Sequence, residues 1–411
     1  MTEKRLKIFV SAYACEPNMG SEIGVGWHWV MEMSKYFDLW VLTRQSNQSN
    51  IEEWLEKNKL ENPPHFVYYD LPRKWRFWKK GLRGVRIYYL LWQRLSNGVV
   101  RKTMRQNNIS IYHHLTYGNA LWSVSRYGQR QTFIWGATSA GSFIERDFTR
   151  HYGFKNRIKE FAQRVIANTL PLNYGFRQRC KKAKLILCKT EQTRLSIPKK
   201  HQNKAVVFTD VAVELIDTKQ HRAKENDHQI TRYLAVGRLE AWRGFDLLIE
   251  AFAKAIKTDP KLHLDILGSG NDKKRLEAII SKHKIEDKVS LTGHLSRECY
   301  YEYMNQCDVV VNPTLKEGAV TTAFDSLSFK KPMICIETGG YTRYFDNRYA
   351  IVLQKKSRNQ TITELSKAII QLTSKTDREE KANEILSQRE RFTWERKGEE
   401  IRDIILKTIN E

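Results

Sequence analysis

The chain of 411 residues and 48.4 kDa is 41% hydrophobic and 11% aromatic, a globular composition that excludes extensive disorder and leaves room for two domains. No apolar run approaches the roughly 18 residues that span a bilayer, and the N-terminus lacks a signal-peptide core, so we expect a cytoplasmic protein. The six cysteines are scattered without a C-x-x-C pair, which indicates neither a zinc site nor a disulfide framework.

The net charge of +24 is concentrated in the N-terminal half. Residues 1–210 carry 36 basic and 15 acidic residues, whereas residues 211–411 carry 34 and 31. Residues 71–144 contain thirteen Lys and Arg and no Asp or Glu. The aromatic residues interleaved with the first of these cations are Trp75, Phe77, Trp78, Tyr88, Tyr89 and Trp92. Such a surface should attract nucleic acid, an acidic membrane or an anionic glycan, and a solvated basic face without a ligand is the alternative.

The first half of the sequence alternates short apolar runs with helical patterns. We predict strands at residues 6–10, 39–43, 109–113, 132–135 and 185–188, and an apolar helix at residues 25–37. This alternation is typical of βαβ units around a parallel sheet. Residues 73–105 interrupt it with an amphipathic helical pattern, which predicts an insertion.

Residues 214–229 are polar and lack hydrophobic periodicity, so they are the best candidate for a linker. Beyond them the alternation restarts. We predict strands at residues 233–236, 262–267, 289–291, 309–311 and 332–336, and helices at residues 245–256, 272–283 and 297–305. This order predicts a doubly wound α/β sheet. Residues 361–411 are predicted to form two or three amphipathic helices.

The segment at residues 316–340 places two carboxylates, Glu317 and Asp325, eight positions apart around a predicted helix start. Eight residues make a little over two helical turns, so both groups can point into one cleft. A strand and a Gly-containing loop precede the helix, whose first backbone N–H groups favour an anion. These features suggest a nucleotide-linked substrate.

Six stretches, in their order and spacing, resemble the retaining, nucleotide-sugar-dependent glycosyltransferases of family four. They are CEPNMGSEIGVGWHW (15–29), HHLTYG (113–118), AVGRLEAWRGFDLLIEAF (235–252), LGSGNDKKRLE (267–277), LTGHLSRE (291–298) and the segment at 316–340. The resemblance implies the α/β GT-B fold, in which two Rossmann-like domains face each other across a cleft. It implies an acceptor-binding domain at residues 1–212, a nucleotide-sugar-binding domain at 213–390 and a helix at 391–411 that returns to the first domain.

Arg238 directly follows a predicted strand and Arg243 precedes a helix, so both cations can face a pyrophosphate at the strand ends. The resemblance makes them the donor-phosphate cations that stabilise the leaving group, although the family usually has lysine at the second position. Surface arginines that cap loops are the alternative. The resemblance also places Gly268, Gly270 and His294 near the nucleotide base.

In this family the residue at Glu317 contacts hydroxyls of the transferred sugar, and the residue at Asp325 holds the nucleotide ribose. The family normally has Glu at the second position, and a plain position on the helix surface is the alternative for Asp325. The backbone N–H groups of Gly318, Ala319 and Val320 would face the diphosphate at the helix start.

In the first domain, Gly20 and Ser21 resemble the family's donor-phosphate loop, with Glu22 as an acceptor ligand. His113 and His114 end a predicted strand, where one imidazole could bond the donor sugar. We favour His114 for this role and assign His113 to the acceptor, and a structural role for either is the alternative.

The resemblance implies transfer of a hexose from a nucleotide diphosphate sugar to a hydroxyl of a lipid-linked or cell-surface saccharide, with retention of configuration. Arg238, Arg243, Glu317 and His114 form the predicted catalytic set. No D-x-D sequence stands near the site, so we expect neither a metal nor another cofactor. The cations and aromatic residues of segment 73–105 predict peripheral contact with an anionic membrane at the inner face of the cell membrane.

Two other classes of protein remain as alternatives. One is a non-catalytic GT-B subunit that binds a sugar nucleotide or a partner, which the Asp at position 325 would allow. The other is a basic nucleic-acid-binding protein, which the sequence disfavours because it contains no recognition motif.

Overall fold

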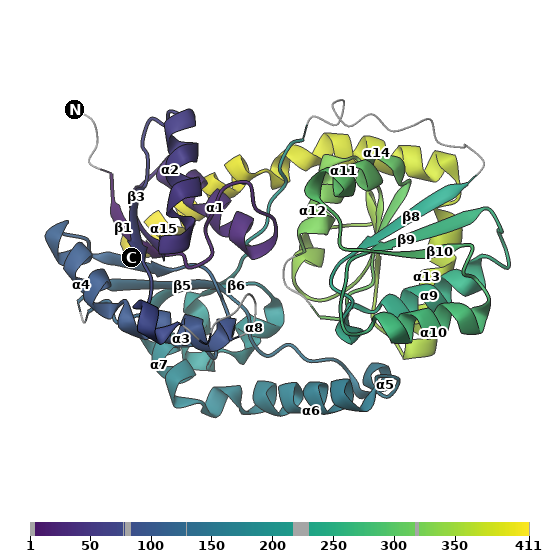
Figure 1. Ribbon diagram of the computed structural model, residues 1–411, viewed down its shortest axis with the longest axis horizontal. Helices are drawn as coiled ribbons and strands as arrows, with labels where there is room; N and C mark the ends of the chain where they lie inside the picture. The colour runs from purple at the N-terminus through teal and green to yellow at the C-terminus, as the bar shows by residue number, and fades with distance from the viewer. Residues whose placement is uncertain are drawn as a thin grey trace. The chain divides into compact units, whose positions relative to one another are not determined.

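The computed structural model describes residues 5–76, 78, 84–128, 130–216, 230–316 and 320–410, which form two compact units (Figure 1). Unit 1 comprises Met1–Gly141, Ala167–Asp210 and Trp394–Glu411, and unit 2 comprises Ser142–Ile166 and Val211–Thr393. Each unit is a parallel sheet with helices, which confirms the predicted α/β class. Within the described ranges, no helix is long and apolar enough to cross a membrane.

The described part of unit 1 contains a seven-stranded parallel sheet in the order β3-β2-β1-β4-β5-β6-β7. Its strands are β1 (Lys7–Ser11), β2 (Asp38–Arg44), β3 (His65–Tyr69), β4 (Ile111–His114), β5 (Thr132–Thr138), β6 (Ala183–Cys188) and β7 (Ala205–Val207). The chain runs outward from β1 to β3 and then returns beside β1 with β4. The direction of winding therefore changes between β1 and β4.

The helices of unit 1 pack on this sheet. They are α1 (Ser21–Ser34), α2 (Gln48–Lys57), α3 (Val85–Leu95), α4 (Asn97–Gln106), α7 (Tyr174–Lys182), α8 (Glu191–Ser196) and α15 (Trp394–Asn410). The last helix packs on α1, where the rings of His28 and Trp394 stack with centroids 5.0 Å apart. Lys397 on the same helix donates to the Thr209 carbonyl at 2.8 Å. Trp394 thus has the contacts of an anchor.

Segment 73–105 contributes the aromatic residues of α3 to the core of unit 1 rather than to the surface that the sequence predicted, whereas Trp75 is 47% exposed and Phe77 lies outside the described residues. Tyr88, Tyr89 and Trp92 on α3 are at most 2% exposed. Tyr89 and Trp92 both pack edge-on against Tyr13, with centroids 5.1 and 5.2 Å apart. The helical period was visible in the sequence, but a helix with this period can bury its aromatic face, as α3 does.

The described part of unit 2 contains a six-stranded parallel sheet in the order β10-β9-β8-β11-β12-β13. Its strands are β8 (Thr231–Val236), β9 (Leu262–Leu267), β10 (Val289–Gly293), β11 (Val309–Asn312), β12 (Met333–Ile336) and β13 (Ala350–Leu353). Here the winding changes direction between β8 and β11. The predicted linker falls mostly on residues 217–229, which lie outside the described residues.

The helices of unit 2 include two that the sequence placed in the first domain. The helices are α5 (Arg146–Thr149), α6 (Phe154–Thr169, to Ile166 in this unit), α9 (Phe245–Ala255), α10 (Lys273–His283), α11 (Arg297–Gln306), α12 (Thr321–Ser328), α13 (Arg358–Gln371) and α14 (Lys375–Gln388). Residues 142–166 join unit 2 because Ile144, Phe148 and Tyr152 belong to its hydrophobic core. The predicted domain boundaries at 212 and 390 took no account of this excursion.

Candidate functional site

In unit 2, the loops after β8 and β11 meet where the winding changes direction. The Leu315 N–H donates to the Trp242 carbonyl at 3.2 Å, which ties one loop to the other. Gly244 has a φ of +69°, and a Cβ at this position would lie 2.2 Å from the Pro313 carbonyl oxygen. Only glycine lets the two loops approach this closely. Ligands of doubly wound sheets bind beyond the carboxyl ends of the strands at such a point.

Both predicted phosphate cations lie on the loop between β8 and α9. Arg238 is exposed, and Arg243 is partly buried. The Arg243 guanidinium stacks 4.5 Å from the centroid of the Trp242 ring, and its Nη1 lies 3.5 Å from Thr314 Oγ1 on the loop after β11. These contacts hold the Arg243 cation between the two loops. Both arginines therefore lie beyond the carboxyl end of β8, and their role as donor-phosphate cations stays a prediction.

Two predicted glycines bring the loop after β9 against the loop after β8. A Cβ at Gly268 would lie 2.0 Å from the Gly237 carbonyl oxygen, and one at Gly270 would lie 2.3 Å from that of Leu239. Backbone packs on backbone here, so a larger residue would push the loops apart. His294, which follows β10, is exposed.

The loop between β11 and α12 is described only at its two ends. Three predicted site residues lie outside the described part of the chain: Glu317, Gly318 and Ala319. Val320 is buried at the N-terminus of α12. On the other side, the buried Lys316 ammonium lies 2.6 Å from the Glu160 carboxylate of α6, and burial lowers the Lys316 pKa. The structure thus fixes both ends of the segment that was predicted to bind the diphosphate.

Asp325 accepts a hydrogen bond from a tyrosine on the neighbouring helix. Tyr300 Oη of α11 donates to Asp325 Oδ2 at 2.7 Å. Burial raises the pKa of Asp325 to about 6, although the bond from Tyr300 and the charge of Arg297 oppose the rise. Burial, together with the carboxylate, raises the pKa of Tyr300. These contacts are not those of a solvated position on a helix surface, and the ribose role of Asp325 stays a prediction.

The predicted loop of unit 1 follows the carboxyl end of β1 and leads into α1, and a second loop follows the neighbouring strand β4. Gly20 precedes α1, and Ser21 adopts a φ of 57° at the first position of this helix. Glu22 Oε1 accepts a hydrogen bond of 2.7 Å from the Tyr117 N–H, just beyond β4. Glu22 therefore connects the two loops where the winding of unit 1 changes direction. Its role as an acceptor ligand, like the donor role of Gly20 and Ser21, stays a prediction.

The two predicted histidines, His113 and His114, are 0% and 2% exposed at the end of β4. His113 Nε2 donates to the Gly136 carbonyl at 2.6 Å, and His114 Nε2 lies 3.2 Å from Tyr89 Oη. Burial lowers the pKa of His113 to about 4 and that of His114 to about 3, so both rings are neutral at pH 7. This placement disfavours acceptor binding by His113. His114 can act only as a neutral hydrogen-bonding group.

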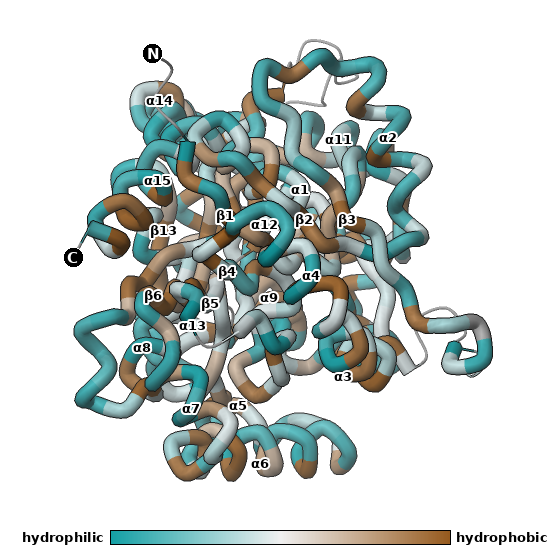
Figure 2. Tube along the Cα trace, turned by 90° about the vertical axis from the view of Figure 1, so that its left-hand side faces the viewer, coloured by the Kyte–Doolittle hydropathy of each residue, from teal (hydrophilic) through white to brown (hydrophobic). Residues whose placement is uncertain are grey.

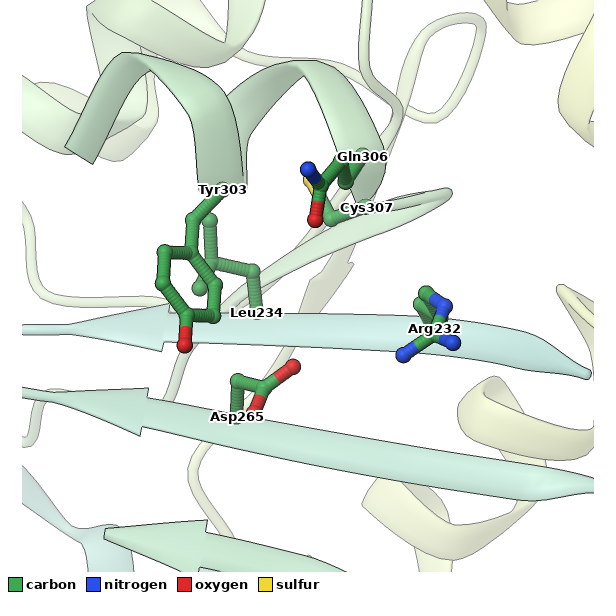
Figure 3. A pocket seen from close by; sticks show the side chains of 6 residues that line it. All are labelled: Arg232, Leu234, Asp265, Tyr303, Gln306 and Cys307. Carbon is green, nitrogen blue, oxygen red and sulfur yellow. The ribbon is translucent and has the colours of Figure 1, made fainter. Parts of the chain in front are cut away.

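A separate pocket of about 150 Å³ lies under α11 (Figure 3). Its lining residues are Arg232, Leu234, Asp265, Tyr303, Gln306 and Cys307. Figure 3 shows the Arg232 and Asp265 side chains rising from β8 and β9 toward Tyr303 and Gln306 of α11. The pocket contains none of the predicted donor residues. Within the described ranges, no three His, Cys, Asp or Glu side chains form a group that could hold a metal ion.

Sequence reasoning missed three residues that support the candidate site: Trp242 beneath Arg243, Tyr300 beside Asp325, and Glu160 paired with Lys316. Trp242 could have been found, because an aromatic residue next to an arginine is a ready cation–π partner. Glu160 lies far from Lys316 in the sequence, and no local pattern signals such a pair.

Comparison with known proteins supports the interpretation of unit 2. Residues 217–389 match the family of glycosyl transferases group 1. The chain is 31% identical to the N-acetylgalactosamine-N,N'-diacetylbacillosaminyl-diphospho-undecaprenol 4-alpha-N-acetylgalactosaminyltransferase of Campylobacter jejuni over an alignment of 128 residues. This alignment covers 31% of this chain and 34% of the relative. The alignments with three curated relatives span between 27% and 53% of the relatives' lengths.

Solved structures extend the likeness to both units. The lipopolysaccharide outer core galactosyltransferase WaaB matches with a TM-score of 0.63 and 15% identity over 98% of this chain and 99% of its own. HepE of Anabaena, solved in complex with UDP and glucose, matches with a TM-score of 0.58 and 13% identity over 98% and 100%. At this identity the likeness shows the fold, and it confirms the predicted GT-B architecture.

Proposed function

We propose that this chain, whose residues 217–389 match the family of glycosyl transferases group 1, is a retaining glycosyltransferase. It transfers a hexose from a nucleotide diphosphate sugar to a hydroxyl of a lipid-linked or cell-surface saccharide. The observation that carries the proposal is the cation pair Arg238 and Arg243 on the loops that meet beyond β8 and β11. The names of the C. jejuni relative, which acts on a diphospho-undecaprenol saccharide, and of WaaB support the acceptor class.

The proposed mechanism stabilises the departing nucleoside diphosphate. The two guanidinium groups and the N-terminus of α12 neutralise the charge that grows on the diphosphate as the glycosidic bond breaks. The acceptor oxygen attacks the anomeric carbon from the same face, and its proton passes to the leaving phosphate. This route retains configuration without a carboxylate nucleophile. In this proposal Glu317 binds hydroxyls of the transferred sugar, and the neutral His114 imidazole donates a hydrogen bond to the same sugar or accepts one from it.

The two arginines take the part that a divalent metal has in other transferases, so the enzyme is proposed to be metal-independent and to need no other cofactor. We expect the transfer rate to stay unchanged after treatment with EDTA. Activity that is lost with EDTA and restored by Mg²⁺ or Mn²⁺ would contradict this part of the proposal.

We also propose that the enzyme works as a cytoplasmic protein in peripheral contact with the inner face of the cell membrane. Exposed cations of segment 73–105 support this contact, among them Arg86, Arg94, Arg101, Lys102 and Arg105. Their attraction to anionic lipid is screened by salt. Sedimentation with anionic vesicles at low salt tests the contact, and protein that stays in the supernatant refutes it.

The decisive experiment replaces Arg238, Arg243 and Glu317 separately by alanine, with Arg232→Ala as the matched control. Arg232 lies near the amino end of the same strand, β8, away from the loops that carry the site. With a panel of nucleotide sugars, we expect each site variant to lose about 10²-fold or more in turnover, as when one transition-state donor is removed. The control should keep its turnover. Near-native turnover of Arg238→Ala or Glu317→Ala would refute the site.

A subunit that binds sugar nucleotides without catalysis is the second candidate. Asp325 favours it, because the shorter carboxylate already holds a hydrogen bond from Tyr300. Binding of UDP without turnover of any nucleotide sugar would identify this case.

A further inference from the structure

The helix α6 carries an exposed apolar stripe along unit 2. Phe154, Ile158 and Phe161 are 75%, 52% and 61% exposed. They recur at i, i+4 and i+7, the spacing of a face that a soluble helix normally buries. None of them belongs to the hydrophobic cores formed by the described residues. Figure 2 shows hydrophobic and hydrophilic stretches alternating along this helix. Two largely exposed phenylalanines on one helix face are typical of a surface that binds a partner.

The polar face of α6 points inward and holds the helix in place. Glu160 is buried against Lys316 at 2.6 Å, and Gln163 bonds to the same ammonium group. Lys159 lies 3.3 Å from Glu240, which gives a further contact to the loop before α9. The exposed stripe is therefore the outer face of a helix that is anchored to unit 2 by its polar residues.

The acidic groups of this segment each contact a basic residue of unit 2, and among them only Glu160 is buried, since the Glu145 side chain is 48% exposed. Glu145 lies 3.0 Å from Lys355, and Asp147 accepts a hydrogen bond from the Arg358 N–H. With Glu160, they are the three carboxylates of residues 142–166, and each is paired with a basic residue of the same unit. The other charged side chains of residues 142–166 are basic.

The exposed arginines and the apolar stripe line one groove. Its volume is about 530 Å³, and Arg146, Arg150 and Arg157 lie in its wall with the stripe. All three arginines are exposed. Such an arrangement, aromatic and aliphatic side chains flanked by cations on one helix face, fits the boundary between lipid headgroups and acyl chains.

We propose that the outer face of α5 and α6 docks on the surface of an anionic lipid bilayer. The phenylalanines and Ile158 enter the boundary region while the three arginines bind the lipid phosphates. The charge complementarity favours an anionic lipid over a second copy of this chain, whose own patch would bring like charges together. This face belongs to unit 2 and is separate from segment 73–105 of unit 1. The Lys316–Glu160 pair ties it to the segment that follows β11.

The test is sedimentation with vesicles of phosphatidylcholine and phosphatidylglycerol in equal parts, with pure phosphatidylcholine vesicles as the comparison. The variants are Phe154→Ser with Phe161→Ser, and Arg150→Glu with Arg157→Glu. Leu386→Ser on α14 and Lys274→Glu with Lys282→Glu on α10 make the same kinds of change at exposed positions outside the groove. Arg101→Glu with Arg105→Glu probes segment 73–105.

We expect the charge-reversal variant to lower the partition coefficient about twentyfold or more, since each cation near an anionic surface contributes roughly fivefold. The serine variant should show a comparable loss, and the two outside variants should bind like the parent chain. Equal binding by the parent chain and both groove variants overturns the proposal, as does a parent chain that binds neither kind of vesicle. A loss confined to Arg101→Glu with Arg105→Glu also overturns it.

Two further measurements separate this inference from the proposed function. Arg238→Ala should sediment like the parent chain, and the serine variant should hydrolyse the donor in solution at the parent rate. Sedimentation velocity in the absence of lipid tests the alternative that this face binds a second copy of the chain. Self-association that the serine variant abolishes, without vesicle binding, overturns the proposal in favour of a dimer.

Discussion

Replacing Asp325 by Asn should stabilise the free protein and weaken nucleotide binding at the same time. The asparagine oxygen can still accept the hydrogen bond from Tyr300 Oη, which is 2.7 Å long, but the charge is gone. Burial raises the pKa of Asp325 from 3.8 to about 6. The folded state therefore binds the proton more tightly than the unfolded state, so stability is present below pH 3.8 and is lost as the pH rises through 6.

The expected gain follows from this shift. One pKa unit corresponds to about 1.36 kcal/mol, so the ionised Asp325 costs at most about 3 kcal/mol above pH 6. The Asp325→Asn variant should recover part of this free energy of unfolding at pH 8. The gain should shrink strongly as the pH falls to about 4, because the folded Asp325 is then protonated and only the unfolded chain, with its pKa of 3.8, still releases part of the proton.

Urea unfolding of both proteins at several pH values between 4 and 8 measures this gain, and a thermal shift with UDP measures binding. Asp346→Asn is the control, because the hydrogen bond from Arg348 lowers the pKa of Asp346 and its removal should bring no gain at pH 8. A gain that is absent at pH 8, or equal at pH 4 and pH 8, refutes the argument from burial. Unchanged UDP binding by Asp325→Asn would refute the ribose role alone.

Three further predictions rest on single contacts. Glu160→Ala leaves the largely buried Lys316 ammonium without its counter-ion, with only Gln163 bonded to it, and should lower the free energy of unfolding by about 3 kcal/mol in urea. Glu160→Leu combined with Lys316→Met should restore the stability, and equal stability of both variants contradicts this. Gly244→Ala should destabilise by more than about 1 kcal/mol because of its φ of +69° and the nearby Pro313 carbonyl. Gly98→Ala in the first turn of α4, where a Cβ would meet no atom within 4 Å, should stabilise slightly, and the reverse order in thermal unfolding would be inconsistent with the structure. Burial holds the folded pKa of His114 near 3, so between pH 6.5 and 3 only the unfolded state takes up the proton, and the free energy of unfolding falls with the pH. The His114→Gln variant should show a smaller fall in this range, and identical pH profiles of unfolding count against this.

The fold was predictable because both sheets lie in regular alternations of short apolar runs and helices. The order of β8 to β12 and the positions of Arg238 and Arg243 beyond β8 follow from that pattern alone. The contacts that position these residues were not predictable. Gly244 fits against Pro313 only because β8 and β11 are neighbours in the sheet, and sequence order alone does not say so. Asp325 read as a solvated or ribose-binding carboxylate, and its bond to Tyr300 required the packing of α11 beside α12.

Helical periodicity alone did not predict which aromatic helix face is buried and which is exposed, as the comparison of α3 with α6 shows. Both α3 and α6 have aromatic residues at helical spacing among arginines, and the sequence analysis singled out only segment 73–105, which contains α3. On α3 the aromatic face packs on Tyr13 and disappears from the surface. On α6 the buried residue is Glu160, which pairs with the Lys316 ammonium. Phe154 and Phe161 lie on the exposed side of the same helix. The Lys316–Glu160 pair, formed across more than 150 positions of sequence, is a contact that helical periodicity alone does not reveal.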